Sequence, residues 1–195
     1  LRRLKSPKIA VYLEDQDEYI VTEVARAIND DLSIPEALPA LAGCLIEKRF
    51  KSEPLLRRAI NAALRVGDDA SMEKLINFAK RSDVLDELRA EAMATLGTWA
   101  EPSVLDRVDG RYRGVVKRDL VHMKTMLLPH IPSFLNDENP AAIVAMAQML
   151  SNLQITDFNE KLADAQMEGD AVIMAEIQKE SDQIIEELDR QILPD

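Results

Sequence analysis

The sequence predicts an all-α protein, a right-handed α-solenoid of HEAT/armadillo-like helical repeats. Three observations predict it. Ala, Leu, Ile and Glu dominate the composition, whereas aromatic residues make up 4% and only 6 residues are Gly, which favours helices over twisted sheets. Small and aliphatic residues recur at helical spacing. The segments in which they recur lie 36 and 32 residues apart, which is the period of helix–turn–helix repeats.

Four segments share one pattern of small and aliphatic residues. Residues 56–64 and 88–96 both begin with Leu-Arg and end with Leu eight residues later, and residues 20–28 and 142–150 fit the same frame. The last offset is 54 residues, so segment 102–118 is predicted to be an insertion. Because one helix pair cannot bury its apolar face alone, we expect the core to form between stacked pairs.

Each of these segments belongs to the second helix of a predicted pair. The pairs are expected at residues 6–14 with 17–30, 35–48 with 53–66, 70–81 with 84–100, and 119–135 with 138–153. Asp, Asn and Gly lie between the pairs, where they cap or end helices. Pro35, Pro54 and Pro140 stand near helix starts, where a missing N–H costs little. Residues 1–155 are thus predicted to form one solenoid of about four helix pairs.

The charge is distributed unevenly along the chain. Residues 1–155 carry a net charge of −2 and residues 156–195 carry −9, out of a total of −11. From Asp170 to Leu193, apolar residues recur at spacings of four and seven, which predicts acidic C-terminal helices with one apolar stripe. The stripe consists of Ile173, Ile177, Ile184, Leu188 and Ile192. This segment is interpreted either as a cap on the last repeat or as a docking helix for a flanking domain or a second copy.

The composition also excludes several function classes. No apolar run approaches the ~20 residues needed to cross a bilayer, and the N-terminus lacks the apolar core of a signal peptide. We therefore expect no membrane insertion. The negative charge argues against nucleic-acid binding, and a single cysteine, Cys44, excludes intrachain disulfides and Cys-rich zinc sites. The chain begins without Met, so we expect it to be a piece of a longer protein.

The densest basic stretch lies in the predicted insertion. Its candidate partner-binding residues are Arg107, Arg111, Tyr112, Arg113, Lys117 and Arg118. Arginine forks suit carboxylates, so this stretch is a candidate docking site for an anionic protein surface. Gly110 and Gly114 permit sharp turns within it. The alternative interpretation is a tied-down connector, in which Asp106, Asp109 and Asp119 neutralise the cations locally.

His122, Met126 and His130 are the residue types that could hold a haem or a soft metal ion. Their spacing places two imidazoles and a thioether on one face of an unbroken helix. However, Pro129 interrupts the helix just before His130, and Met-rich helices commonly pack in cores. We therefore expect no metal site and no cofactor in this chain.

The remaining distinctive residues are interpreted as structural. Trp99 and Tyr112 are not expected to form a base-stacking pocket in a chain this acidic. Glu23 and Glu91 occupy repeat-equivalent positions and are expected on solvated faces. Cys44 lies among apolar residues with no histidine base nearby in the sequence, which indicates a buried small hydrophobe. We expect no catalytic residue and no enzymatic activity in this chain.

Several runs resemble one bacterial family. They are residues 19–31 (YIVTEVARAINDD), 34–41 (IPEALPAL), 88–99 (LRAEAMATLGTW) and 102–114 (PSVLDRVDGRYRG). They resemble the HEAT-repeat region of large membrane-bound dehydrogenase or haem-binding proteins, over residues 10–115. In that family the solenoid lies between a β-propeller similar to sugar dehydrogenases and a C-terminal cytochrome c domain.

The resemblance implies a scaffold or protein-interaction module that links two such domains. It implies a periplasmic or cell-surface location, with flanking domains or another protein as partners. No catalytic residue carries over, because the propeller and the C-x-x-C-H haem attachment are absent from these residues. The alternative is a redox accessory domain that supplies a haem or metal ligand from His122, Met126 or His130.

Overall fold

The regular secondary structure in the part of the chain that the structure describes is helical. A computed structural model describes residues 2–30, 34–135, 137 and 139–155. Over these residues the all-α prediction is confirmed, and an isolated antiparallel bridge between Leu105 and Tyr112 is the one strand-like contact in them. The predicted acidic helices of residues 156–195 lie outside the described residues.

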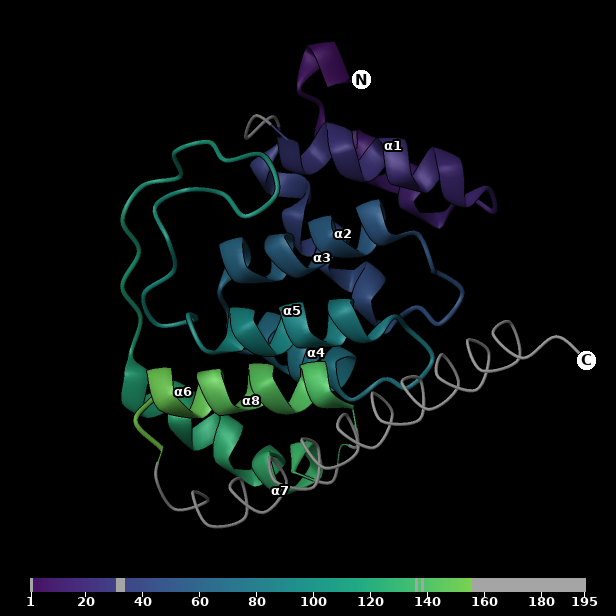
Figure 1. The fold of residues 1–195 in the computed structure, drawn as a ribbon. Helices are drawn as coiled ribbons and strands as arrows, with labels where there is room; N and C mark the ends of the chain where they lie inside the picture. The colour runs from purple at the N-terminus through teal and green to yellow at the C-terminus, as the bar shows by residue number, and fades with distance from the viewer. Residues whose placement is uncertain (1, 31–33, 136, 138, 156–195) are drawn as a thin grey trace, which may run out of the picture.

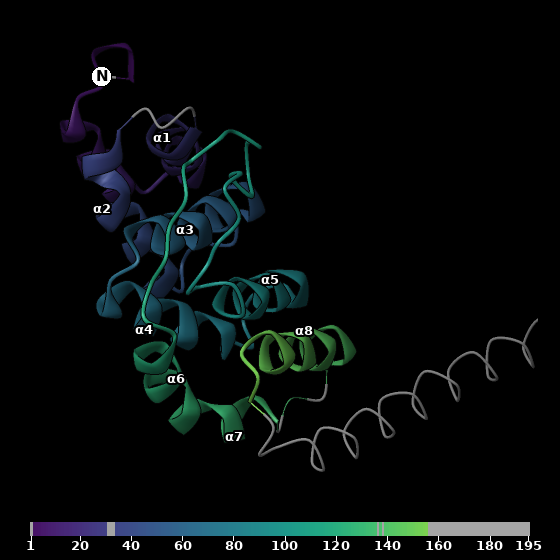
Figure 2. The ribbon, with the colours of Figure 1, turned by 90° about the vertical axis from the view of Figure 1, so that its left-hand side faces the viewer.

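The helices alternate between two layers (Figures 1 and 2). One layer contains α1 (Glu18–Asn29), α3 (Glu53–Val66), α5 (Asp86–Leu96) and α8 (Pro140–Asn152). The other contains the helix α4 (Asp69–Ala79) and the shorter elements η2 (Pro7–Glu14), η4 (Pro35–Ala37), α2 (Leu38–Gly43), η5 (Cys44–Ile46), α6 (Leu120–Leu127), η6 (Leu128–His130) and α7 (Ile131–Phe134). The 3-10 turn η1 (Arg2–Leu4) precedes them in the chain. Within the first layer α1 packs on α3, α3 on α5, and α5 on α8. Across the layers α2 packs on α3, and α4 packs on α5.

Capping residues define where the longer helices begin and end. Asp17, Asp68, Asp119 and Asn139 each accept a hydrogen bond from a backbone N–H of the first turn of α1, α4, α6 and α8, respectively. These bonds satisfy donors that the helix itself leaves unpaired. Gly67, with a φ of +70°, ends α3 in the left-handed conformation that glycine adopts without strain.

Prolines lie at a break in each of two predicted helices. Range 35–48 becomes three short elements, and Pro39, near the start of α2, lacks the N–H that a helix continuous from Pro35 would need. Range 119–135 divides after Leu127, and Pro129 lies in the 3-10 turn that follows. The break before His130 that the sequence predicts is therefore confirmed.

The core lies between the two layers and consists mainly of Leu, Ile and Ala. Ala59, Ala62 and Ala92 are fully buried and let neighbouring helices approach closely. At Gly97, just after α5, an added Cβ would lie 2.9 Å from the Cα of Met149, so the close contact with α8 requires a glycine. Across the described residues, the helices are too short or too polar to span a membrane.

Candidate functional site

Among the described residues, the longest non-helical segment is 97–119, which connects α5 to α6 and runs back along the first layer as far as α1 (Figure 1). Part of it, residues 104–113, forms a hairpin. Asp106 N donates to Arg111 O at 2.8 Å, and Arg113 N donates to Val104 O at 2.7 Å. Because side chains alternate between the two faces of a strand, this register separates Asp106 and Arg113 from Leu105 and Tyr112.

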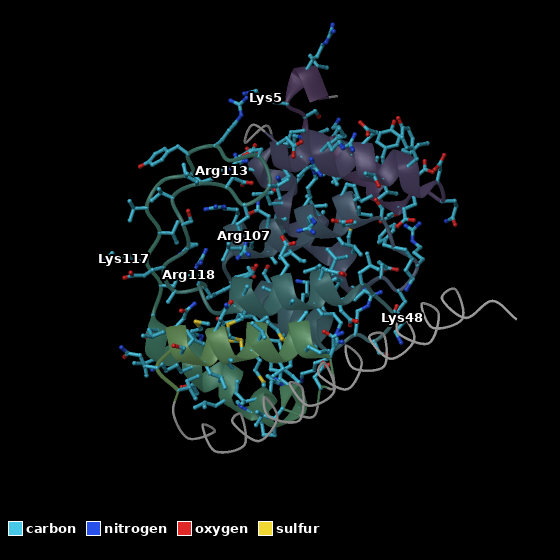
Figure 3. The ribbon with its side chains drawn as sticks, in the orientation of Figure 1. Lys5, Lys48, Arg107, Arg113, Lys117 and Arg118 are labelled. Atoms are coloured by element: carbon cyan, nitrogen blue, oxygen red, sulfur yellow. The ribbon has the colours of Figure 1, made fainter. Side chains whose placement is uncertain are left out.

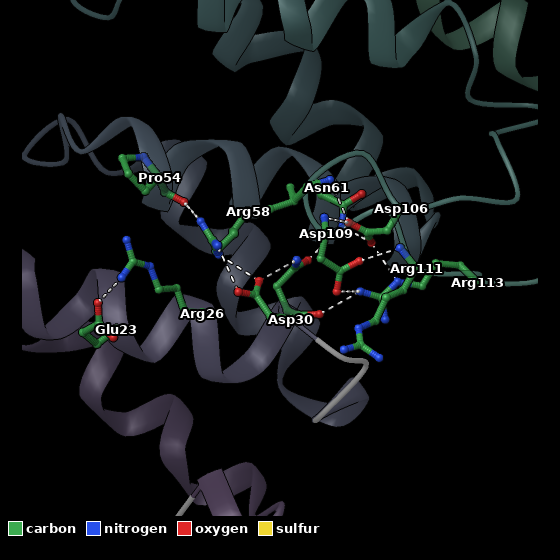
Figure 4. Close-up of polar contacts among 12 residues, drawn as sticks. Glu23, Arg26, Asp30, Pro54, Arg58, Asn61, Asp106, Asp109, Arg111 and Arg113 are labelled. Atoms are coloured by element: carbon green, nitrogen blue, oxygen red, sulfur yellow. Dashed lines mark hydrogen bonds and ion pairs between the residues drawn. The ribbon is translucent and has the colours of Figure 1, made fainter.

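Asp106 is the centre of a buried polar cluster on the inward face of the hairpin (Figure 4). Its side chain is 0% exposed and accepts hydrogen bonds from Asn61 Nδ2 at 2.7 Å, Arg113 Nε at 2.8 Å and Val108 N at 2.8 Å. Burial raises the pKa of Asp106, but these hydrogen bonds outweigh burial and hold the pKa below its ordinary value. The carboxylate therefore stays ionised inside the protein.

Two of the predicted binding residues instead attach the segment to the helices. Arg113 Nη2 donates to Asn29 O at the end of α1 at 3.0 Å, and its side chain is only 2% exposed. Arg118 Nη2 donates to Leu64 O of α3 at 2.6 Å, and its guanidinium lies 5.1 Å from the ring centroid of Trp99. Cations suit the carbonyl-rich C-terminal ends of helices, where the helix dipole is negative. For these two arginines, the contacts match the alternative interpretation, in which the segment is a connector held against the helices.

The other four predicted residues, Arg107, Arg111, Tyr112 and Lys117, are exposed. Figure 3 shows Lys117 at the outer edge of the segment and Arg107 facing the helices of the first layer. Arg107 also lines a groove on that layer. The sequence analysis did not identify this groove.

The groove crosses α3, α5 and α8 and has a volume of about 640 Å³. Its floor is apolar, and the charged residues Arg57, Glu87, Glu91 and Arg107 line it as well. The remaining lining residues are Ala90, Ala94, Pro140, Ala141, Val144, Ala145 and Gln148. Among the described residues that line it, none is His, Cys, Ser or Thr.

Glu91 corrects one expectation from the sequence. Its side chain is 12% exposed rather than solvated, and it accepts a hydrogen bond from Arg57 Nη1. Burial raises the pKa of Glu91, and Arg57 opposes that increase. Arg57 also donates from Nε to Glu53 at 2.8 Å, and this hydrogen bond is the main cause of its raised pKa. Glu23 is 42% exposed and pairs with Arg26, as a solvated carboxylate does.

The structure does not bring the two histidines together. His122 Nε2 lies 2.9 Å from Asp69 Oδ1 at the start of α4, whereas His130 Nδ1 lies 2.8 Å from Lys80 Nζ just after the end of α4. At 1.5 Å per residue, these two ends of α4 are about 16 Å apart, too far for one metal ion to bind both imidazoles. Met126 packs against the core. In the described part of the chain, His, Cys, Asp and Glu form no cluster of three or more that could hold a metal ion.

Cys44 is buried, with 3% of its surface exposed. Burial raises the pKa of its thiol to about 12, which keeps the sulfur protonated and a poor nucleophile at neutral pH. This environment is the one expected from its apolar neighbours in the sequence.

Comparison with protein-family models, curated proteins and solved structures finds no match to this chain. The groove on the first layer is therefore the main indication of its function. The signal for the groove was present in the sequence, because Ala90 with Ala94 and Ala141 with Ala145 place small residues on one face of α5 and of α8. The charged residues that share the groove come from α3 and the connecting segment, and the sequence alone does not place them there.

Proposed function

We propose that residues 1–155 form a right-handed α-solenoid of HEAT/armadillo-like repeats that acts as a non-catalytic scaffold for protein interactions. The alternation of helices between two layers supports this proposal. The corresponding helices α1, α3 and α5 begin at residues 18, 53 and 86, which is a repeat-like interval. Helix α8 begins later, at residue 140, because segment 97–119 comes before it.

The groove on the first layer is the observation that carries the proposed function. It spans three successive helices of one layer, and extended surfaces of this kind are what helical-repeat proteins use to bind partners. Alanines in its floor leave room for a partner backbone or helix. The Arg57–Glu91 pair and Arg107 supply polar contacts that fix orientation.

We further propose that this module is the linker domain of a periplasmic sugar dehydrogenase-like, haem-binding protein. The resemblance of residues 10–115 to the HEAT-repeat region of such proteins supports this assignment. The proposal makes a flanking domain or another protein the occupant of the groove, and it assigns any oxidation chemistry to domains outside these residues.

Site-specific photo-crosslinking in the complete gene product tests the proposed function. A benzophenone amino acid replaces Ala141, which is exposed and lines the groove. The matched control replaces Thr125, which is exposed on α6 in the other layer. We expect crosslinks from position 141, and not from position 125, to one defined surface of a flanking domain or partner. Equal crosslinking from both positions, or none from position 141, would refute binding in the groove.

A further inference from the structure

We propose that the outer side of α1, away from α3, binds an α-helix of a partner molecule, which packs on α1 as α3 packs on α5. The surface for this helix is a hollow beside η2 and α1, with a volume of about 380 Å³. Its lining residues are Ile9, Tyr19, Ile20, Glu23, Val24 and Ala27. The inference goes beyond the groove function, because the hollow shares no lining residue with the groove and lies at the opposite end of the first layer from α8 (Figures 1 and 2).

The hollow lies on the side of α1 that faces away from α3. On the α3 side, Asn29 Oδ1 of α1 accepts a hydrogen bond from Asn61 Nδ2 of α3 at 2.8 Å. Successive residues of an α-helix are rotated by about 100°, so the opposite side of α1 carries Ile20, Val24 and Ala27. The three residues line the hollow together.

The corresponding positions of the other first-layer helices are closed by packing. They are the third, seventh and tenth positions, counted from the first residue of each helix. In the other three helices they are 0–1% exposed, and they are Leu55, Ala59 and Ala62 in α3, Leu88, Ala92 and Thr95 in α5, and Ala142, Met146 and Met149 in α8. Met149 lies against Gly97, at the end of the preceding helix α5. In α1 the same positions border the hollow, and Ile20 is 40% exposed.

The sixth position of α3 and of α5 forms an ion pair with the preceding helix pair. Arg58 of α3 donates from Nε to Asp30, which directly follows α1, at 2.9 Å (Figure 4). Glu91 of α5 accepts a hydrogen bond from Arg57 of α3. Both contacts point back along the row of helices, toward the element that comes before. The packing between these helices therefore combines an apolar strip with one charge pair.

Glu23 holds the sixth position of α1. It pairs with Arg26 of the same helix at 2.6 Å, and both side chains are 42% exposed (Figure 4). Exposed ion pairs contribute little free energy, so a cation of an incoming helix can take the place of Arg26 without a large cost. The surface beside α1 therefore repeats both parts of the interface, the apolar strip and the charge.

The contact between α3 and α5 indicates what the partner helix carries. There, Arg57 faces Glu91, and the buried residues Ile60 and Leu64 follow Arg57 on the same side of α3 after three and seven residues. Because Glu23 corresponds to Glu91, the partner is an amphipathic helix with an arginine beside aliphatic residues at this spacing. A carboxylate at the edge of an apolar hollow disfavours a nucleic acid, whose phosphates it repels.

A peptide copy of α3 tests the proposal. It has the sequence of residues 52–66 and a fluorescein label, and a hydrocarbon staple between positions 58 and 62 keeps it helical, because short helices are marginal in water. Positions 58 and 62 belong to the side of α3 that meets α1, so the staple leaves the Arg57 side free. Fluorescence anisotropy measures binding of this peptide to the full chain.

Two substitutions in α1 probe the two parts of the surface. Ile20→Glu is expected to weaken binding about tenfold or more, because it places a charge against the aliphatic side chains of the peptide. The matched control, Val144→Glu, changes a residue that is 52% exposed and lines the groove, and its binding is expected to be unchanged. A peptide with Arg57→Glu is expected to bind the unmodified chain about tenfold more weakly and to regain affinity for Glu23→Arg. Circular dichroism melting curves confirm that the variants fold.

Several results would overturn the proposal. They are equal binding of a scrambled stapled peptide, equal affinity of Ile20→Glu and Val144→Glu for the peptide, or no recovery in the charge exchange. Loss of binding in Val144→Glu alone would place the peptide in the groove instead. A dimer in sedimentation equilibrium that Ile20→Glu dissociates would show that a second copy covers this side of α1. Because crosslinks from position 141 report on the groove and the peptide assay reports on α1, either proposal can fail while the other holds.

Discussion

The buried carboxylate of Asp106 offers the sharpest test of how the long segment is held. The variant Asp106→Asn keeps the shape of the side chain but removes its charge. The carboxylate accepts four hydrogen bonds in the described structure, from Val108 N, Asp109 N, Asn61 Nδ2 and Arg113 Nε. An amide can accept at one oxygen only, so two of the four contacts become donor facing donor.

The expected destabilisation is large because the cations around Asp106 are buried too. The side chains of Arg113 and Arg65 are 2% and 9% exposed, and Arg65 Nε lies 3.8 Å from Asp106. Removing one partner of a buried ion pair typically costs about 3–5 kcal/mol. We expect Asp106→Asn to lower the free energy of unfolding by an amount in that range.

Urea unfolding at pH 7, followed by circular dichroism, measures this change. Glu23→Gln, which breaks the exposed pair with Arg26, is the matched control and is expected to cost less than about 1 kcal/mol. The folded-state pKa of Asp106 lies below its ordinary value, so its carboxylate stabilises the fold above the unfolded pKa. That contribution is lost as the pH falls through the folded pKa, and the gap between wild type and Asp106→Asn should narrow there. Equal urea midpoints for the two variants at pH 7 would refute the reasoning.

Three further predictions concern other parts of the molecule. Gly97→Ala places a methyl group 2.9 Å from the α8 backbone, and thermal unfolding should show a loss of about 1–3 kcal/mol. Cys44 should react with a thiol reagent at pH 8 only as fast as the protein unfolds, because burial raises the pKa of the thiol to about 12; rapid labelling of the native protein would contradict its placement. The pKa of His122 should exceed its ordinary value in an NMR titration and return toward it in Asp69→Asn, since the hydrogen bond to Asp69 is the main cause of the increase. The stabilisation from this contact is complete below the unfolded pKa and is lost as the pH rises through the folded one.

The positions of the helices could be predicted because their signals are local. Asp68 and Asn139 cap helices through hydrogen bonds to residues within a single turn, so they act in the same way in any surrounding fold. Pro129 interrupts the predicted helix because a proline in a helix interior cannot donate the backbone hydrogen bond. The helix type was less predictable, since short segments such as η2 adopt 3-10 geometry under the constraints of packing.

The arrangement of the basic stretch could not be predicted from spacing alone. Six candidate residues have similar local sequence contexts, yet Arg113 turns inward and Tyr112 turns outward because the hairpin register places them on opposite faces. The inward residue Asp106 accepts a hydrogen bond from the buried Asn61, which lies 45 residues earlier in the sequence. A pattern of alternating inward and outward residues in 104–113 is the signal that could have indicated the sorting.

The long segment also changes how the proposed repeats depend on one another. In a simple repeat array each unit contacts only its neighbours. Here Arg113, which follows the third helix pair, hydrogen-bonds to Asn29 at the end of the first pair, 84 residues earlier. Arg118 reaches Leu64 of the second pair in the same way. The segment therefore joins three pairs along one edge, and disruption of Asp106 should loosen the hairpin and the wall of the groove that Arg107 forms. This coupling explains why so many buried polar contacts are concentrated in a connection between helices.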